Sequence, residues 1–398
     1  MKQTGDKSAS SSPAREQAQT PSSPSTTPPR HVAPTEGQAV FALYQHLRHV
    51  GVVTTIEQVI NLYLSLKTVP ILVLDGPAGV GKDLVARTMC EGMGTQFAWL
   101  PMTNETGSGP ANAPLRLRDL LGQTDARSGQ FRPELLFEAL LAARENPDAP
   151  HVICLDTIDG WQEDAWLSEY VRLLDSQEHT EDGRWASMPI VVVPGYETLQ
   201  TVDGKSVPAR FPLPDNVFLM LTTMGRIGLG DITVERSNVV ELGPADLSLD
   251  AVRPGDEPEG TTAGELGKML VTRRTHRTIG DILDRPWVEA WNEEIMQVSG
   301  MLEEMDLGIG YRLRDDILRY LAYADDLNAQ FPYGISFPLD VAFDHQLAQR
   351  VVTRLFTREP DHDVVSELLM YAQGSQNHGT LRFPRTAAQL GMLQRRME

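Results

Sequence analysis

The stretch ILVLDGPAGVGKDLVARTMC, residues 71–90, decides the fold. A short apolar run, 71–75, ends in a glycine-rich loop, and a helical pattern begins near Lys82. The loop GPAGVGKD, 76–83, matches the pattern G-x-x-x-x-G-K, in which backbone N–H groups, a helix N-terminus and a lysine surround phosphate oxygens. The sequence therefore predicts a site for ATP, GTP or the corresponding diphosphate. The residues expected to contact the nucleotide are Gly76, Pro77, Ala78, Gly79, Val80, Gly81, Lys82, Asp83 and Leu84.

Asp83 stands where this pattern normally has Ser or Thr. The hydroxyl group at that position binds the Mg²⁺ ion that accompanies the nucleotide. A carboxylate also binds Mg²⁺, but at this position it would lie close to phosphate oxygens of the same charge. Two alternatives stay open. Either the metal is held differently, with Asp83 as a ligand, or binding of the triphosphate is weakened.

Strand and helix patterns alternate after the loop. Continuous apolar runs of this kind are typical of strands that are buried on both faces of a parallel sheet. The strands expected besides 71–75 are 97–101, 151–156, 216–223 and 238–242. Helices are expected over 133–145, with Pro133 in the first turn, and over 163–176. The segment 188–213 has β-prone pieces around an Asp-Gly pair, which predicts an inserted hairpin.

Composition divides the chain into four parts. Residues 1–36 are rich in Ser, Thr, Pro and Gln and contain no aromatic residue, which predicts a disordered tail. We expect an α/β nucleotide-binding domain over 37–245. An acidic loop rich in Pro and Gly follows over 246–262, and a mostly helical lid domain completes the chain over 263–398.

The charge of the chain limits its partners. The formal net charge is −19, and the first 36 residues hold four Lys or Arg against three Asp or Glu, so the excess lies in the folded part. An acidic surface argues against direct nucleic-acid binding. The basic cluster RRTHR, 273–277, is interpreted as a solvated loop. The chain has no apolar run long enough to span a bilayer and no apolar stretch at its N-terminus, so we expect a cytoplasmic protein without membrane contact.

The segment VICLDTID, 152–159, provides a second motif. Asp156 follows four apolar residues and matches the Walker B aspartate, which orients Mg²⁺ through water. NTPases of this class place Glu next, where it polarises the attacking water, but this chain has Thr157, which is no base at neutral pH. Loss of a general base typically lowers the rate roughly 10²–10⁴-fold. Asp159 is a candidate replacement, although a polar residue that ends the strand is the simpler interpretation.

The order of these motifs resembles the McrB-type branch of AAA+ NTPases, the motor subunits of modification-dependent restriction systems. The resemblance covers about residues 54–398. Besides the loop, it is carried by LRDLLGQ at 117–123, PDNVFLMLTTM at 214–224, ERSNVVEL at 235–242 and LGIGYRLRDDILRYLAYAD at 307–325.

This resemblance implies a P-loop AAA+ domain with a helical lid, assembled as a homomeric or heteromeric ring, usually of six subunits, with nucleotide between subunits. Arg236 corresponds best to the arginine that reaches the γ-phosphate of a neighbour. Arg312 or Arg314 would sense nucleotide within the same subunit. The alternative for these two lid arginines is a surface ion pair with Asp315 or Asp316.

The departures from the family pattern lie on the hydrolytic side. Gly225 stands where the family has a sensor asparagine, in addition to Asp83 and Thr157. The glycines, Lys82, Asp156 and Arg236 are retained. We therefore predict a McrB-like ring subunit that binds nucleotide with impaired or absent hydrolysis and that scaffolds or regulates a partner effector protein, in a bacterial defence or restriction-like system.

Two alternatives remain at this point. The first is an active ATP- or GTP-hydrolysing motor coupled to an effector or nuclease, with Asp83 on the metal. The second is an interaction module that no longer binds nucleotide.

Overall fold

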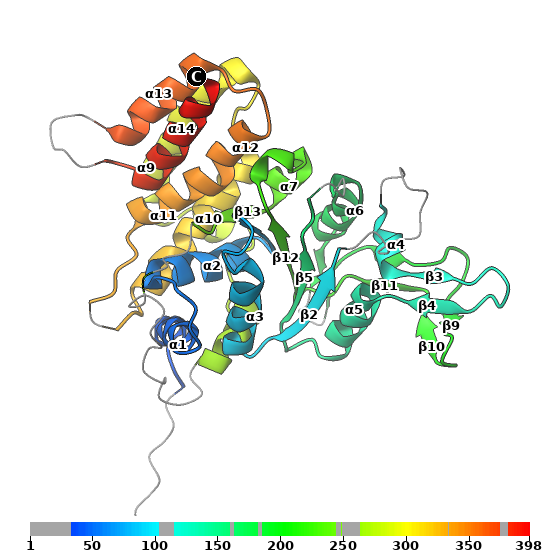
Figure 1. Ribbon diagram of the computed structural model, residues 1–398. Coiled ribbons are helices and arrows are strands. Elements are labelled where there is room, and N and C mark those ends of the chain that lie inside the picture. The colour runs from blue at the N-terminus through cyan, green and yellow to red at the C-terminus, as the bar shows by residue number, and fades with distance from the viewer. Residues whose placement is uncertain are drawn as a thin grey trace, which may run out of the picture. The chain divides into compact units, whose positions relative to one another are not determined.

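Figure 1 shows a computed structural model of the protein. The structure describes residues 33–102, 115–159, 163–181, 185–243, 248, 263–332, 334–374 and 381–398. Most of the predicted tail, 1–36, and all of the predicted acidic loop, 246–262, except position 248, lie outside these residues.

The centre of the fold is a parallel sheet of five strands in the order β13-β1-β12-β5-β2. Its strands are β1 (Ile71–Asp75), β2 (Gln96–Pro101), β5 (His151–Asp156), β12 (Val217–Thr223) and β13 (Asn238–Glu241). Ile71 of β1 is in register with Leu219 of β12, and Val217 of β12 is in register with His151 of β5. The mixed α/β architecture with a parallel sheet agrees with the sequence prediction.

The side chains of each strand point alternately into two cores. Leu72 and Leu74 of β1 belong to one core, together with the helices at the N-terminus and those of the C-terminal part. Ile71 and Val73 belong to the other. The helices before β2 are α1 (Glu36–His49), α2 (Ile56–Thr68) and α3 (Lys82–Met93), and those of the second core are α4 (Leu117–Leu121), α5 (Leu135–Glu145), α6 (Asp164–Asp175) and α7 (Asp231–Arg236). Burial on both faces explains why the strands are apolar throughout rather than alternating.

The predicted insertion between α6 and β12 is present. β8 (Pro189–Val191) pairs antiparallel with β11 (Arg210–Pro212), and β9 (Thr198–Gln200) pairs with β10 (Ser206–Pro208) around the Asp-Gly turn. Figure 1 shows β9 and β10 beside a third small ladder, which the sequence did not indicate. This ladder joins β3 (Gly122–Thr124) to β4 (Phe131–Pro133). A fourth joins β6 (Glu178–His179) to β7 (Trp185–Ala186).

One helix boundary was predicted incorrectly. Pro133 lies at the end of β4, where it pairs with Gly122, and not in the first turn of a helix. The N–H of Glu134 donates to the carbonyl of Leu121 at 3.0 Å. The chain is therefore still paired with the opposite strand where the first turn of the helix was expected. α5 therefore begins at Leu135.

The C-terminal part consists mostly of helices, as predicted, and packs into the same core as α1, α2 and α3. It contains α8 (Leu266–Thr272), α9 (Val288–Leu302), α10 (Tyr311–Asn328), α11 (Leu339–Gln346), the π-helix η5 (Leu347–Val352), α12 (Thr353–Phe356), α13 (His362–Gln373) and α14 (Pro384–Met397). Short 3₁₀ turns are η1 (Arg226–Gly228), η2 (Ala263–Glu265), η3 (Ile279–Asp281) and η4 (Glu303–Met305). Within the described residues, none of the helices is both long enough and apolar enough to cross a membrane.

The folded part begins before residue 37. The Thr35 side chain caps α1 by accepting a hydrogen bond from the N–H of Gln38. The buried carboxylate of Glu36 accepts hydrogen bonds from the hydroxyl of Tyr63 and the ammonium of Lys67, both at 2.5 Å. The tail was predicted to extend to residue 36, but this cap and this buried ion pair hold its last two residues in the fold.

Candidate functional site

The loop between β1 and α3 is formed by its glycines and by Lys82. Gly79 and Gly81 have φ angles of 84° and 86°, in the left-handed region that glycine adopts without a steric penalty. Lys82 Nζ donates to the carbonyl oxygens of Gly76 at 2.7 Å and Pro77 at 3.0 Å. The ammonium group therefore lies against the backbone of the loop rather than in open solvent.

The N-terminus of α3 is available to a ligand. Its N-cap, Gly81, has no side chain to accept from the first-turn N–H groups. The helix extends over 12 residues, so its unpaired N–H groups and its dipole favour an anion at this end. Pro77, Ala78 and Gly79 are exposed, whereas Val80 is half-buried. Asp83 and Leu84, in the first turn, are exposed as well. The arrangement has the groups needed to bind phosphate.

Asp156 lies at the same edge of the sheet as the loop. It ends β5, which is separated from β1 by β12 alone, so two strand spacings, about 10 Å, separate it from the end of β1. Its carboxylate accepts a hydrogen bond from the Thr222 hydroxyl at 2.5 Å, and the same hydroxyl oxygen accepts from the N–H of Thr157 at 2.7 Å. Thr157 is one of two non-glycine residues with positive φ in the described part of the chain, at 59°.

Asp159 is engaged in the backbone at the end of β12. Its carboxylate accepts hydrogen bonds from the Thr223 hydroxyl at 2.9 Å and from the N–H of Met224 at 3.0 Å. Gly225 follows directly and has no side chain that could orient water. The contacts of Asp159 are those of a residue that ends a strand, and its use as a base stays a prediction.

Arg226 is a site residue that the sequence reasoning missed. The buried guanidinium donates to Asp75 at 2.8 Å and to Glu241 at 2.7 Å. Gln389 of α14 donates to the same Glu241 at 3.1 Å. This network joins the ends of β1 and β13 to the residue after Gly225 and to the last helix. Its only signal in the sequence is one arginine and two carboxylates at strand ends.

Arg236 and Arg312 both bind the carboxylate of Asp175, a residue that the sequence did not indicate. Arg236 donates to both oxygens of Asp175, at 2.9 and 2.6 Å, and Arg312 donates to one of them at 3.2 Å. Burial raises the pKa of Asp175, but the hydrogen bonds and charge of Arg236, with the charge of Arg312, lower it overall. Arg314 instead pairs with its neighbour Asp315 at 2.6 Å.

These arginines are at the opposite edge of the sheet from the loop. Asp175 ends α6 and lines a cavity with Val69 and Pro70, which precede β1. The loop follows β1, a strand of five residues that spans about 16 Å. The structure therefore does not bring Arg312 or Arg236 to the loop of the same chain.

The basic cluster 273–277 was predicted to be a solvated loop, and this prediction is wrong. Arg274 Nε donates to the backbone carbonyl of Lys67 at 3.0 Å, and the ring of His276 is buried and contacts Asp326 at 2.7 Å. The guanidinium of Arg277 stacks over the ring of Trp185 at 5.4 Å. Contacts with segments distant in sequence turn these side chains inward, and charge counting along the sequence does not detect them.

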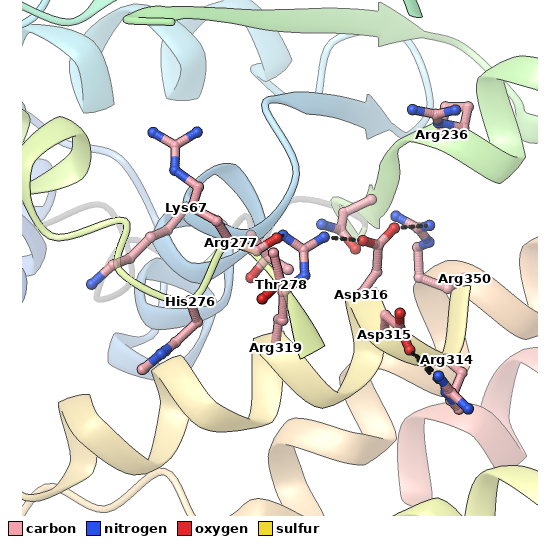
Figure 2. A network of polar contacts seen from close by, with 12 residues as sticks. Lys67, Arg236, His276, Arg277, Thr278, Arg314, Asp315, Asp316, Arg319 and Arg350 are labelled. Carbon is pink, nitrogen blue, oxygen red and sulfur yellow. Dashed lines mark hydrogen bonds and ion pairs between the residues drawn. The ribbon is translucent and has the colours of Figure 1, made fainter. Parts of the chain in front are cut away.

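Asp316 of α10 neutralises two arginines beside this cavity. Figure 2 shows its carboxylate between Arg319 and Arg350. Arg350, which is fully buried, donates to Asp316 at 2.9 Å and to the backbone carbonyl of Glu235 at 2.9 Å. The pair therefore connects α10 and η5 to the segment that leads into β13.

The described residues contain neither a reactive thiol nor a preformed cluster of metal ligands. Cys90 and Cys154 are free and buried, and burial raises the pKa of both thiols, so neither is a nucleophile near neutral pH. No group of three or more His, Cys, Asp or Glu in the described residues is placed to hold a metal ion. A Mg²⁺ ion at the loop would therefore depend on Asp156, Asp83, water and the phosphates of the nucleotide.

The matches to known proteins cover only part of the chain or have low sequence identity. A family model described as a domain of unknown function, DUF8727, matches residues 273–398, which is less than half of the chain. No curated protein matches the sequence. Among solved structures, the chain is similar to one from Cytophaga hutchinsonii described as a "putative ATPase", with 16% identity and a TM-score of 0.42, over 74% of this chain and 83% of that one. The fold and the site described above rest on the structure of this chain itself.

The space around each glycine of the loop predicts that alanine substitutions at Gly76 and Gly79 destabilise the protein to different extents. A Cβ atom on Gly76 would lie 2.7 Å from the carbonyl oxygen of Leu242, whereas one on Gly79 would have no neighbour within 4 Å. Gly79→Ala should lower the free energy of unfolding by about 1–2 kcal/mol, the penalty for a left-handed alanine. Gly76→Ala should lower it by roughly 1–3 kcal/mol more, because the backbone must move. Urea unfolding followed by circular dichroism measures both, and equal losses would contradict this account of the loop.

Asp316 should be essential to stability and its neighbour Asp315 should not. Asp316→Asn leaves the buried Arg350 and the half-buried Arg319 without this counter-charge, so we expect the free energy of unfolding to fall by roughly 3–5 kcal/mol. Asp315 has a side chain that is 27% exposed, and within the described residues it pairs with Arg314 alone, so Asp315→Asn should change it by about 1 kcal/mol or less. Denaturant unfolding of the two variants tests this, and comparable losses would show that Asp316 is not the counter-charge of this cluster.

Proposed function

We propose that the loop at residues 76–84 binds a nucleoside triphosphate or diphosphate, and that the chain hydrolyses it slowly or not at all. The observation that carries the proposal is the position of Lys82, whose ammonium donates to the carbonyls of Gly76 and Pro77 at the uncapped N-terminus of α3. An ammonium and free backbone N–H groups at one helix end are the groups that bind phosphate. A bound phosphate would exchange the loop carbonyls for its own oxygens as partners of Lys82.

Slow hydrolysis is proposed from the groups around this loop. Mg²⁺, when bound with the nucleotide, neutralises charge that develops on the phosphates. Asp156 would orient the ion, while the carboxylate of Asp83 would be close to phosphate oxygens. Thr157 and Gly225 provide no base and no water-orienting side chain. Asp159 would have to give up its hydrogen bonds to Thr223 and Met224 to act as a base. Thr157, Gly225 and the contacts of Asp159 would lower the rate of hydrolysis rather than the affinity for nucleotide, whereas Asp83 would also weaken the binding of a triphosphate.

The biological role is proposed from the resemblance to McrB-type AAA+ proteins. We propose that the chain assembles into a ring, with six subunits favoured, and that Arg236 serves the nucleotide of a neighbouring subunit. In a ring that also contains subunits with intact motifs, Arg236 would support their hydrolysis. The ring would scaffold or regulate an effector protein in a bacterial defence system. Arg236 lies at the amino edge of the sheet, away from the loop of its own chain. This position supports a role toward the nucleotide of a neighbouring subunit.

Bound nucleotide provides the direct test. The purified protein is incubated with Mg²⁺ and equimolar ATP or GTP, separated from free nucleotide and denatured, and the released nucleotide is identified by chromatography. We expect intact triphosphate from the wild type and none from Lys82→Ala, because the variant lacks the ammonium at the loop. Lys268→Ala is a matched control, since Lys268 is exposed and, in the part of the chain that the structure describes, pairs with Glu265 alone, at 3.6 Å.

The other outcomes each select a different function. Steady conversion to diphosphate by the wild type would refute impaired hydrolysis and indicate an active motor with an unusual metal ligand. Absence of bound nucleotide in the wild type would refute the proposal altogether and favour the nucleotide-free interaction module.

A further inference from the structure

A cavity of about 230 Å³ lies at the amino edge of the sheet, between the strands and α10. Five of its lining residues are arginines, although the chain as a whole carries a net charge of −19. The arginines are Arg236, Arg274, Arg277, Arg312 and Arg319. Asp175 and Asp316 are the acidic residues among the described ones that line the cavity, so these residues have a formal charge of +3, five positive charges against two negative ones.

The arginines of this cavity are neutralised unequally. Arg236 and Arg312 share Asp175, and Arg319 pairs with Asp316. Arg274 makes one hydrogen bond, from Nε to the carbonyl of Lys67, and its two terminal nitrogens have no partner among the described residues. Arg277 forms a longer ion pair with Asp215, at 3.8 Å. The excess positive charge therefore lies mainly on Arg274 and in part on Arg277.

The positive charges of these two guanidinium groups also repel each other. Burial lowers the pKa of Arg274, and the nearby charge of Arg277 lowers it further. Burial also lowers the pKa of Arg277, against the opposing charge of Asp215. Guanidinium groups nevertheless stay protonated in proteins, so the strain is relieved by an anion rather than by loss of a proton. The buried Arg350, which shares Asp316 with Arg319, has two nitrogens, Nε and Nη1, without a partner among the described residues.

We propose that this cavity binds a small phosphate-bearing anion through Arg274 and Arg277, separately from the loop at residues 76–84. Planar guanidinium groups donate paired hydrogen bonds that match the oxygens of phosphate. A volume of about 230 Å³ is below the roughly 300–1,000 Å³ of sites for drug-sized ligands. The ligand is therefore of the size of phosphate or diphosphate, free or as the end of a larger molecule.

The bound anion would connect the helical part to the sheet. Arg274 is held by the residue next to the end of α2, Arg277 by Trp185 of β7, and both precede η3 and the helices that follow it. Arg319 of α10 donates to the backbone carbonyl of Arg277 at 3.3 Å, so α10 contacts the same segment (Figure 2). An anion that binds only this arrangement stabilises it by mass action.

The test measures binding of inorganic diphosphate to the full chain by calorimetry, in the Lys82→Ala background so that the loop does not contribute. We expect saturable binding that Arg274→Gln and Arg277→Gln each weaken roughly tenfold or more, as the loss of a charge-assisted hydrogen bond predicts. Arg118→Gln is the matched control, because its side chain is 70% exposed and its one ion pair among the described residues is with the adjacent Asp119. It should leave the affinity unchanged.

A second variant separates loss of the site from loss of the fold. Arg277→Lys keeps the charge but not the paired hydrogen bonds, so it should bind diphosphate more weakly than the parent and more tightly than Arg277→Gln. Each variant is compared with the parent by circular dichroism, and binding is evaluated for those with the parent's spectrum. AMP and ADP in place of diphosphate distinguish a nucleotide's phosphates from free phosphate, and tight binding of either kind supports the site.

Two results would overturn the proposal. Equal affinity for diphosphate in the parent, Arg274→Gln and Arg277→Gln would place the anion elsewhere. Binding that is present in the wild type and absent in Lys82→Ala would assign it to the loop of this chain or of a neighbouring copy. Neither result counts against nucleotide binding at the loop, because that is tested separately with triphosphate and the intact Lys82.

Discussion

A parallel sheet must bury both of its faces, and the rest of this structure follows from that constraint. All five strands run in one direction, and helices cover the two cores to which their side chains belong. Only the two edges where strands begin and end are left for ligands. At the carboxyl edge, the loop of Lys82 follows β1 and Asp156 ends β5. At the amino edge, the cavity lined by arginines lies beside Val69 and Pro70. The two proposed sites are therefore separated by the length of the strands.

Buried ion pairs fix how the helical part meets each edge. At the carboxyl edge, Arg226 is held by Asp75 and Glu241, and Gln389 of α14 binds the same glutamate. At the amino edge, Asp316 of α10 holds Arg350. Such pairs add little net stability compared with apolar packing, but removal of one partner is costly because it leaves a buried charge alone. They therefore make other packings of the helices on the sheet unfavourable. Arg274 has no carboxylate partner among the described residues and Arg277 has only the distant one of Asp215, at 3.8 Å. That difference is what distinguishes a binding cavity from a structural ion pair.

The sequence predicted what depends on local pattern. The five strands, the helices and the inserted hairpin were recognisable because burial on both faces requires continuous apolar runs, and the loop could be located because its glycines and Lys82 are adjacent in sequence. Contacts between distant residues were not recognisable. Arg274 bonds to a carbonyl 207 positions earlier in the chain, so the cluster 273–277 looked like a solvated loop. Asp175 gave no signal at all, because an acidic residue at a helix end is ordinary until two arginines are found on it. Pro133 was misplaced since the partner of its strand, Gly122, is part of a three-residue ladder too short to show a pattern.

The shared carboxylate of Asp175 bears on how Arg236 would act in a ring. An arginine that leaves a paired carboxylate for a neighbouring subunit normally leaves an unneutralised charge, which opposes the movement. Here Arg312 donates to the same carboxylate at 3.2 Å, so Asp175 keeps a partner when Arg236 moves away. The side chain of Asp175 is also 39% exposed, which lets water replace the lost hydrogen bonds. An anion bound by Arg274 and Arg277 would add negative charge beside both arginines and would compete with Asp175 for them. Occupancy of the cavity would in this way change how readily Arg236 is released, and so connect a small ligand at the amino edge to the nucleotide of the next subunit.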